Sequence, residues 1–530
     1  MTSLITYSAV SSPLLLFLSA IPSSAWADRH PRCMAKLCGT FSIVAVLTAG
    51  LAGISIFYNG SFAAGYMWQW LYIDRLSVMM LMLVAFIGAV VIRYSRHYLD
   101  GDPGQGRFFK WLALTIAAVM SLVIAGHFIV FVLAWILTSL CLHKLLLFYP
   151  ERQGAQIAAR KKFVFSRLGD FALILAGIWL YQVFGTLEFR ELFSVADKPV
   201  ADNGLLNAAA FALVIGAVIK SAQFPFHSWL PEVMETPTPV SALMHAGIIN
   251  AGGFLVIRMS HILVQAPAAL HLLAVIGTIT ALFGSLVMLT QTSIKKSLAF
   301  STIGQMGFMM LQCGLGAFSS AMLHIVAHAL YKAHAFLSSG SVVDIARSAW
   351  APPVRDNRHP GELLLAFIAA LALTVGGAGL FDLTFQEEPG IVLLGAILQM
   401  ALTYLLWNTL AHHAGPLQIG KALLIASGVS LLYFGLQTGF LHLLHANIAG
   451  QMPIDSLFDS LLLTIVLAGF FTILMLQIQY PGPTAAKIWQ AAYVHIYNGF
   501  YISTLANRML NRYRPKPSRV NHHQSEGMPL

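Results

Sequence analysis

The sequence is poor in charged residues. Asp, Glu, Lys and Arg make up 10% of its 530 positions, whereas hydrophobic side chains make up 58% and the mean hydropathy is +0.74. Soluble globular domains carry about 25% charged residues, so this composition excludes an ordinary soluble protein. Apolar runs of about 18 residues or more recur along the chain, and each can cross roughly 30 Å of hydrocarbon as a helix. The composition therefore predicts an all-α polytopic membrane protein.

Sequence signals of enzymes, metal sites and cofactors are also scarce. The four cysteines have neither a paired metal-site spacing nor the pattern of a disulfide framework. Walker loops, GxSxG and CxxC motifs, and a GxGxxG after a strand are all missing. We therefore predict no catalytic centre, no cofactor and no metal in this chain.

The apolar runs predict about fifteen membrane spans. The first, which includes a signal-like stretch ending at Ala27, is expected to be retained because it lacks a basic flank. The predicted spans are 4–27, 38–58, 72–92, 108–126, 127–148, 163–184, 205–224, 239–260, 267–290, 297–316, 319–341, 361–381, 391–411, 419–440 and 455–478.

Basic residues fall unevenly on the two sides of these spans. If the N-terminus lies outside, most of the 31 Lys and Arg residues lie on the inner side. The four on the outer side are Arg75, Arg190, Lys198 and Arg258. The positive-inside rule thus predicts an external N-terminus and a cytoplasmic C-terminus. Because topology explains the positive charge, the lipid bilayer is expected as a partner and nucleic acid is not.

Lys220 lies inside a predicted span and directly before a proline-rich break. Pro225 and Pro231 cannot continue a helix, so the backbone groups they free must bond to protein or water. A charge at the bilayer centre costs at least about 2.5–3.5 kcal/mol, which makes Lys220 a functional candidate. A lysine in such a place can take up and release protons. The alternative is a lysine that snorkels to the interface.

Two more candidates follow the break. Glu235 lies in the proline-rich segment, and His245 lies about one turn into the next span. Histidine is the side chain best suited to relay protons at physiological pH. The alternative for His245 is a histidine that is hydrogen-bonded for structure alone.

His324, His328 and Lys332 are spaced i, i+4 and i+8 within one predicted span. This spacing places all three on one helical face and indicates a polar path through the bundle. Two histidines at i and i+4 can also bind a metal, but no nearby carboxylate or cysteine completes such a site.

Asp170 lies near the start of its span, and Lys144 lies on the preceding span. A pair between these two side chains would lower the cost of burying both. We therefore predict that they are either part of a proton pathway or a structural ion pair.

Three long motifs resemble those of one known family. They run from Lys220 to Ala246, from Gln291 to Gly307 and from His324 to Ser341, and shorter matches occur at Tyr94-Ser95 and 167–170. The chain over roughly residues 70–345 is similar to the proton-pumping membrane subunits of respiratory complex I and of multisubunit cation/proton antiporters.

This resemblance implies about fourteen helices with two inverted five-helix repeats, each containing a broken helix. It implies that Lys220 is the central proton-carrying lysine and His245 the adjacent relay. It further implies that His324, His328 and Lys332 continue the path through the membrane.

The sequence departs from the family pattern at two places. The family has a glutamate after a tryptophan in the span before Asp170, but Trp135 is followed by Ile136 here. Asp170 and Glu235 are the candidates to replace that carboxylate. The second broken-helix region usually supplies a lysine or glutamate, whereas residues 391–411 contain only Gln399 and Asn408 as large polar groups.

The C-terminal region gives a further indication. A short amphipathic segment from Trp489 to Leu510 resembles the C-terminal end of the membrane subunit of bacterial inorganic-carbon accumulation (DAB) complexes. That resemblance implies a subunit that conducts cations, namely protons, and is not itself an enzyme. It implies a zinc-containing cytoplasmic partner similar to a β-carbonic anhydrase. A subunit of NADH-quinone oxidoreductase and a sodium/proton antiporter subunit are the alternatives.

We predict four regions along the chain. They are N-terminal transmembrane helices at 1–107, an antiporter-like core at 108–445, a last transmembrane helix at 446–480, and a cytoplasmic amphipathic segment with a disordered tail at 481–530.

Overall fold

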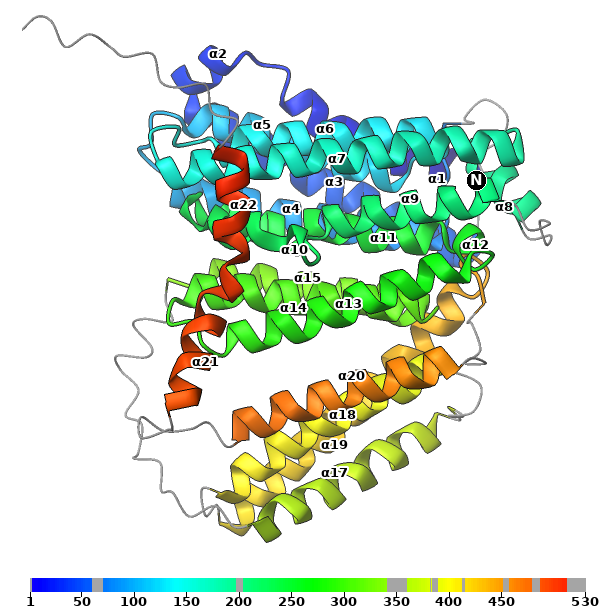
Figure 1. The fold of residues 1–530 in the computed structure, drawn as a ribbon. Helices are drawn as coiled ribbons and strands as arrows, with labels where there is room; N and C mark the ends of the chain where they lie inside the picture. Colours follow the sequence, from blue (N-terminus) through cyan, green and yellow to red (C-terminus); the bar gives the residue numbers. More distant parts are fainter. Residues whose placement is uncertain are drawn as a thin grey trace, which may run out of the picture.

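The computed structural model describes residues 2–59, 70–196, 204–340, 360–381, 383, 389–411, 415–450, 457–478 and 487–511. Regular structure in these residues is helical, apart from two isolated β-bridges. Most of the long helices run roughly side by side (Figure 1). The prediction of an all-α polytopic protein is confirmed.

Each of the fifteen predicted spans coincides with helix. Eleven of these helical segments are long and apolar enough to cross a membrane, α1 and α9 are apolar but shorter, and α14 and α15 carry more polar side chains. The helices are α1 (Thr2–Ser19), α3 (Pro31–Asn59), α4 (Arg75–Tyr98), α5 (Gln105–Val123), α6 (Phe128–Leu146), α7 (Gln153–Phe184), α9 (Gly204–Lys220), α10 (Thr238–Ala246) with α11 (Ala251–Arg258), α13 (Pro267–Met288), α14 (Ile294–Gly314), α15 (Phe318–Leu337), α17 (Pro360–Leu380), α18 (Pro389–Ala411), α19 (Pro416–Leu444) and α20 (Leu457–Ile478).

Two predicted spans differ most from the helices that the structure shows. The span 4–27 is divided, because α1 ends at Ser19 and α2 (Ser24–Arg29) starts after Pro22, capped by the Ser23 hydroxyl accepting from Trp26 N. Helix α7 starts at Gln153, well before the predicted start at 163. The earlier start moves basic residues that were predicted in a loop into the helix.

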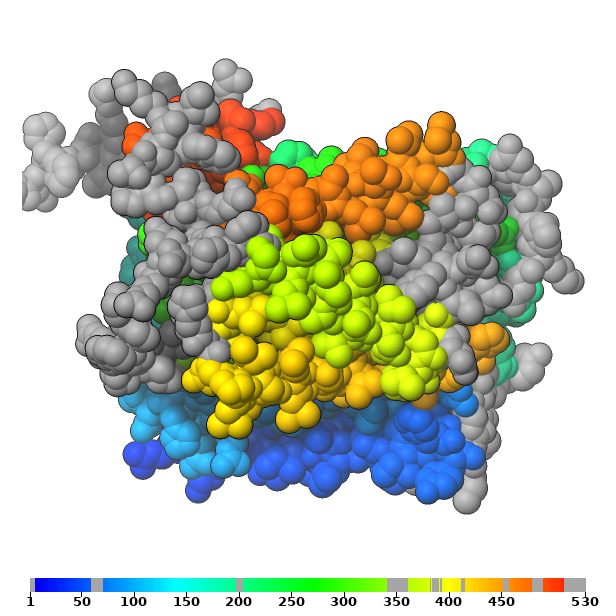
Figure 2. Space-filling view, turned by 90° about the horizontal axis from the view of Figure 1, so that it is seen from below, coloured from blue at the N-terminus to red at the C-terminus, as the bar shows by residue number. Residues whose placement is uncertain are grey.

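The helices pack around two main hydrophobic cores. The larger runs through α1 to α15, and a smaller one lies among α17, α18, α19 and α20. In Figure 1 these four helices form a group of their own beside the rest, and Figure 2 views that group from its outer side. Contacts of α15 with α19 and of α13 with α20 join the group to the larger body.

One end of the bundle carries many basic residues, and we call it the basic end. It is the end at which α4 and α6 finish and α5, α7 and α14 begin. Helices α21 (Lys487–Tyr497) and α22 (Ile502–Asn511) lie across it, roughly perpendicular to the others (Figure 1). The predicted C-terminal amphipathic segment is therefore helical, but it is two helices.

The chain changes direction between α21 and α22 through three consecutive residues with positive φ. The φ values are +55° at Gly499, +52° at Phe500 and +63° at Tyr501. Non-glycine residues rarely adopt this region, so local contacts must hold it. Tyr497 O accepts from Gln291 Nε2 at 3.0 Å, and Phe500 packs near Phe283, so the turn is fastened to the ends of α13 and α14.

Arg258, which was predicted on the outer side, lies at the end of α11 away from the basic end, and it is buried with 2% of its surface exposed. Its guanidinium donates to both carboxylate oxygens of Asp74, at 2.7 and 3.0 Å, and to Ser77 Oγ at 2.7 Å. Asp74 also caps α4, because its Oδ1 accepts from Ser77 N at 2.7 Å. This network links the start of α4 to the end of α11.

Candidate functional site

The predicted break after Lys220 is present. Helix α9 ends at Lys220, and Ala222 has a left-handed φ of +49°. Short 3-10 helices, η2 (Phe226–Trp229) and η3 (Pro231–Glu235), follow before α10. A backbone group freed by the break finds a side-chain partner, since Phe224 N donates to Thr280 Oγ1 at 3.0 Å.

Glycines bring the neighbouring helices close to the break. Gly169 of α7 and Gly216 of α9 face each other, and a Cβ on either would lie within 4 Å of the other's carbonyl oxygen. A Cβ on Gly252 of α11 would lie 2.3 Å from Ser221 Oγ. Because these glycines have no side chains, α7 and α11 can approach α9 closely near its end at Lys220.

Around Lys220 the structure gathers ionisable side chains from α7 and α9, and we call Lys162, Arg167, Asp170 and Lys220 the lysine cluster. Lys220 is partly buried, and its Nζ lies 3.4 Å from Trp135 O and 4.3 Å from the centroid of the Trp135 ring. The Asp170 carboxylate interacts electrostatically with Lys220 and forms an ion pair with Arg167 at 2.7 Å. Asp170 itself is 4% exposed.

Lys162 was not predicted as a site residue. It is buried, and its Nζ donates to both the carbonyl and the hydroxyl oxygen of Ser139 at 2.8 Å. It also interacts electrostatically with Lys220 and Asp170. Its position near the sequence start of a predicted span concealed it, because basic residues there normally lie at the membrane interface.

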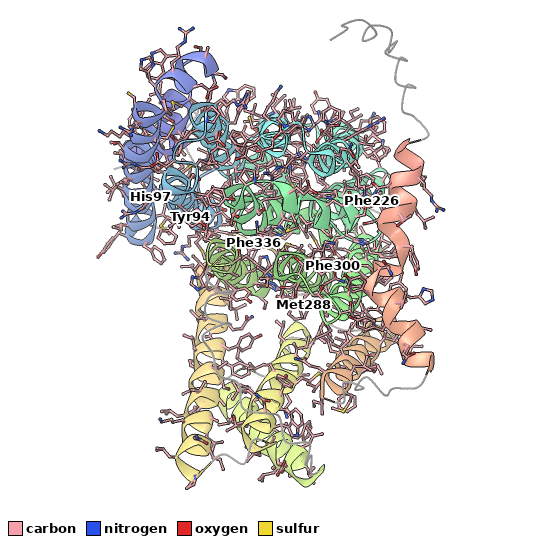
Figure 3. The ribbon with its side chains drawn as sticks, turned by 90° about the vertical axis from the view of Figure 1, so that its left-hand side faces the viewer. Tyr94, His97, Phe226, Met288, Phe300 and Phe336 are labelled. Atoms are coloured by element: carbon pink, nitrogen blue, oxygen red, sulfur yellow. The ribbon has the colours of Figure 1, made fainter. Side chains whose placement is uncertain are left out.

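A second group, which we call the histidine row, consists of His245, His324, His328 and Lys332. His245 Nδ1 lies 3.0 Å from Thr302 Oγ1, and its ring stacks on Phe336 with 4.3 Å between centroids. Phe336 is labelled in Figure 3, which views the bundle from the basic end. His245 interacts electrostatically with Lys332, and His328 interacts with both.

His324, His328 and Lys332 lie along one face of α15, as their spacing predicts. The rings of His324 and His328 have centroids 5.9 Å apart, and His328 also interacts electrostatically with Lys332. Lys332 donates to Ser301 Oγ and to Leu298 O, and His324 Nδ1 lies 2.9 Å from Gln312 Oε1. Helix α14 therefore supplies the polar partners; Leu298 and Ser301 lie within the motif from Gln291 to Gly307, whereas Gln312 lies outside it.

Two family models match the chain. Residues 125–375 match "NADH:quinone oxidoreductase/Mrp antiporter, TM", and residues 70–109 match "NADH-Ubiquinone oxidoreductase (complex I), chain 5 N-terminus". Both groups of ionisable residues described above lie within the first match.

Individual relatives extend the match over most of the chain. The chain is 40% identical to the probable inorganic carbon transporter subunit DabB2 of Halothiobacillus neapolitanus, over 84% of this chain and 80% of that protein. It is 36% identical to the probable inorganic carbon transporter subunit DabB of Hydrogenovibrio crunogenus, over 80% of this chain and 82% of that protein. The chain belongs to the DabB family. That family lies within the wider group of antiporter-like membrane subunits that conduct cations.

A solved structure shows that the fold is shared. The chain superposes on a chain of the Mrp complex from Dietzia sp. DQ12-45-1b with a TM-score of 0.61 and 23% identity. The superposition covers 95% of this chain and 60% of the other. At this identity the likeness establishes the architecture alone.

Two predicted site residues of this DabB-family chain lie away from both groups. Lys144 is exposed and lies near the Trp111 ring, so the predicted contact with Asp170 is wrong; Asp170 pairs with Arg167 one turn earlier instead. Glu235 is exposed at the basic end, where its carboxylate lies beside Gly154 at the start of α7. Asp170 is therefore the one of the two candidate carboxylates that approaches Lys220.

Within the described residues, the region 391–411, where the resemblance placed a second broken helix, is not broken. Helix α18 is continuous from Pro389 to Ala411, since no proline follows its first residue. Gln399 lies in this helix, and its Nε2 donates to Phe367 O of α17 at 3.0 Å. An amide joins the two helices here, at a region where the family usually supplies a titratable group.

Beyond the histidine row a groove opens toward α19. It has a volume of about 450 Å³ and is lined by His324 and His328 on one side and by Tyr433 and Gln437 on the other. Gln437 is hydrogen-bonded to Ser320. The Nε2 atoms of both histidines are buried at the edge of this groove and have no hydrogen-bond partner among the residues that the structure describes.

Proposed function

We propose that this chain is the energy-coupling, proton-conducting membrane subunit of an inorganic-carbon accumulation complex. The observation that carries the proposal is the 40% identity to a probable inorganic carbon transporter subunit over 84% of the chain. The two groups of ionisable residues supply what proton conduction requires inside a membrane, namely titratable side chains in polar contact with one another. The conducting core is residues 108–445.

In this proposal protons pass from the lysine cluster to the histidine row and leave through the groove between α15 and α19. Lys220 is the carrier, Asp170 is its counter-charge, and Lys162 helps to set the local field. His245, His328 and His324 relay protons past Lys332. Support comes from the pairwise contacts within each group and from the unpartnered Nε2 atoms at the groove.

The proposed partner is a zinc-containing cytoplasmic subunit similar to DabA, which resembles a β-carbonic anhydrase and would hydrate CO2 to bicarbonate. The basic end is the proposed docking face, because α21 and α22 cover it and present exposed side chains. Asn507 of α22 donates to Glu232 Oε1 at 3.0 Å, and the same oxygen pairs with buried Lys161 at 2.7 Å. These contacts link the proposed docking face to Lys161, which precedes Lys162 of the lysine cluster.

We further propose that the chain lies in a bacterial inner membrane with its N-terminus outside and its basic end in the cytoplasm. The gathering of basic side chains at that end supports this orientation.

A sodium/proton antiporter subunit is the second candidate. The match of residues 125–375 to the NADH:quinone oxidoreductase/Mrp antiporter family model favours it. Ile136 and Gln399 weigh against both this role and that of a respiratory pump, since they occupy positions where the resemblance implies ionisable groups.

Purification of the chain from its native membrane, with mass spectrometry of bound proteins, separates these functions. One large zinc-containing partner is expected. Small membrane subunits in its place would favour antiport, and flavin or iron–sulfur subunits would favour respiration. The purified pair, reconstituted in vesicles, is then expected to convert CO2 into trapped bicarbonate and to stop when a protonophore collapses the gradient.

A further inference from the structure

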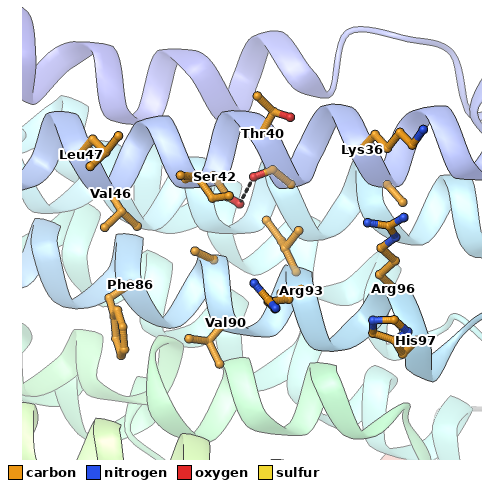
Figure 4. A pocket seen from close by; sticks show the side chains of 15 residues that line it. Lys36, Thr40, Ser42, Val46, Leu47, Phe86, Val90, Arg93, Arg96 and His97 are labelled. Carbon is orange, nitrogen blue, oxygen red and sulfur yellow. Dashed lines mark hydrogen bonds between the residues drawn. The ribbon is translucent and has the colours of Figure 1, made fainter.

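A groove between α3 and α4 has no part in the function proposed above. Its volume is about 630 Å³, and it opens to the outside of the bundle. Figure 4 shows that its two ends differ: Lys36, Arg96 and His97 gather at one end, while Leu47, Val46 and Phe86 lie at the other. Arg93 lies between them, one turn before Arg96.

The charged end of the groove is unbalanced. Lys36, Arg93, Arg96 and His97 are exposed, and the groove has no carboxylate among its lining residues. Within the described part of the chain, the side chains of Lys36, Arg93 and Arg96 make no ion pair. Cations drawn together from two helices without an acidic partner create a positive potential that attracts an anion.

The other end of the groove is apolar and open. Ile43 is 58% exposed, Leu47 66% and Phe86 50%, and all three line the groove. Phe86 lies two helical turns from Arg93, which is about 10 Å along the axis. A ligand that fills the groove therefore needs an anionic head and an apolar part that extends at least this far.

We propose that this groove binds an anionic glycerophospholipid, with its phosphate among Lys36, Arg93 and Arg96 and an acyl chain along Ile43, Leu47 and Phe86. The groove runs parallel to the membrane-spanning helices, with its charges at the basic end, as a lipid in the adjoining leaflet requires. Basic pockets between transmembrane helices are suited to such headgroups. A free phosphate would leave the apolar end of the groove unoccupied.

Binding is measured on the full chain in detergent by native mass spectrometry, with phosphatidylglycerol and phosphatidylcholine titrated separately. Phosphatidylglycerol is expected to bind more tightly. The double variant R93Q/R96Q is expected to bind it about 30-fold more weakly, because each surface cation near a lipid headgroup contributes about fivefold. Lys421→Gln, an exposed lysine at the same end on α19, is the control and should keep the full affinity.

The groove itself is tested with two glycines of α3. A Cβ atom on either Gly39 or Gly50 would meet nothing within 4 Å, but only Gly39 of the two lines the groove. Gly39→Leu is expected to lose phosphatidylglycerol binding, and Gly50→Leu to retain it. Both should keep the thermal midpoint of the lipid-free protein, which shows that they fold.

Three results would overturn the proposal. They are equal affinity of the wild-type protein for the two lipids, an unchanged affinity in both R93Q/R96Q and Gly39→Leu, and displacement of the lipid by millimolar inorganic phosphate. The last would mean that an anion alone is recognised.

Discussion

The Nζ atom of Lys220 lies 4.3 Å from the centre of the Trp135 ring and 3.4 Å from the carbonyl oxygen of the same residue. Trp135 thus contacts the Lys220 ammonium. The next residue, Ile136, stands where the family has a glutamate. A ring face attracts a cation by about 0.5–2 kcal/mol but cannot accept its proton. Asp170 is therefore the carboxylate that can balance the charge of Lys220.

Lys220→Ala is expected to abolish growth in air while growth at elevated CO2 continues, because carbon uptake would lose its proton carrier. Lys144→Ala is the matched control, since that lysine lies on the neighbouring helix α6 but is exposed. Growth rates at the two CO2 levels measure both. Normal growth of Lys220→Ala in air would contradict the proposed role.

Asp170→Asn and Glu235→Gln distinguish the two candidate carboxylates. Each removes one negative charge with little change in shape, but only Asp170 is buried beside Lys220. We expect Asp170→Asn to reduce proton flux into reconstituted vesicles at least tenfold and Glu235→Gln to leave it within about twofold, since losing a counter-charge for a buried cation costs well over 1.4 kcal/mol. Equal effects of the two variants would remove Asp170 from the pathway.

The Asp74–Arg258 pair is expected to be structural. Arg258→Met should lower the free energy of unfolding by about 3–5 kcal/mol, because it leaves a buried carboxylate without its partner. Asp74→Leu combined with Arg258→Met should lose less than the sum of the two single variants. Thermal unfolding in detergent measures all three proteins. Strict additivity would show that the two charges do not depend on each other.

Asn507→Asp is expected to release α22 from the basic end. It would place a second carboxylate about 3 Å from Glu232, where like charges repel. Faster proteolytic cleavage between α21 and α22, together with weaker retention of the partner subunit, is the predicted result. The control is Asn498→Asp, because among the described residues the Asn498 side chain donates to Val494 O, within its own segment. Cleavage at the wild-type rate in Asn507→Asp would show that this contact does not hold α22.

Tyr149, in the loop between α6 and α7, gives a prediction for pH. Its burial and its hydrogen bond to the Asp102 carboxylate, at 2.9 Å, raise its pKa to about 12 from an ordinary 10.0. A raised pKa means that the stabilisation from this group is complete below pH 10 and disappears as the pH rises toward 12. Tyr149→Phe should therefore show a shallower fall in stability over pH 10–12. In a titration followed by phenolate absorbance, the variant should show one tyrosine fewer among those that ionise at the highest pH.

The helices and the polar face of α15 could be predicted because both depend on local periodicity. Apolar runs reveal membrane spans, and the i, i+4, i+8 spacing of His324, His328 and Lys332 fixes one face. Lys162 could not be found in this way, because the hydropathy signal of α7 starts ten residues after the helix does. The burial of Arg258 could not be predicted either, because its partner Asp74 is 184 positions away in the sequence. Gln312 and Thr302 meet their histidines only through the packing of α14 on α10 and α15.

The composition of the lysine cluster has an electrical consequence. Lys162, Arg167 and Lys220 face a single carboxylate, Asp170, so the cluster carries more positive than negative groups. Moving one elementary charge across the full membrane does work of about 2.3 kcal/mol per 100 mV. A displacement of the Lys220 ammonium along the bilayer normal therefore responds to the transmembrane voltage, and its protonation responds to the local proton concentration. If Lys220 carries protons as proposed, the same side chain would respond to both components of the proton-motive force.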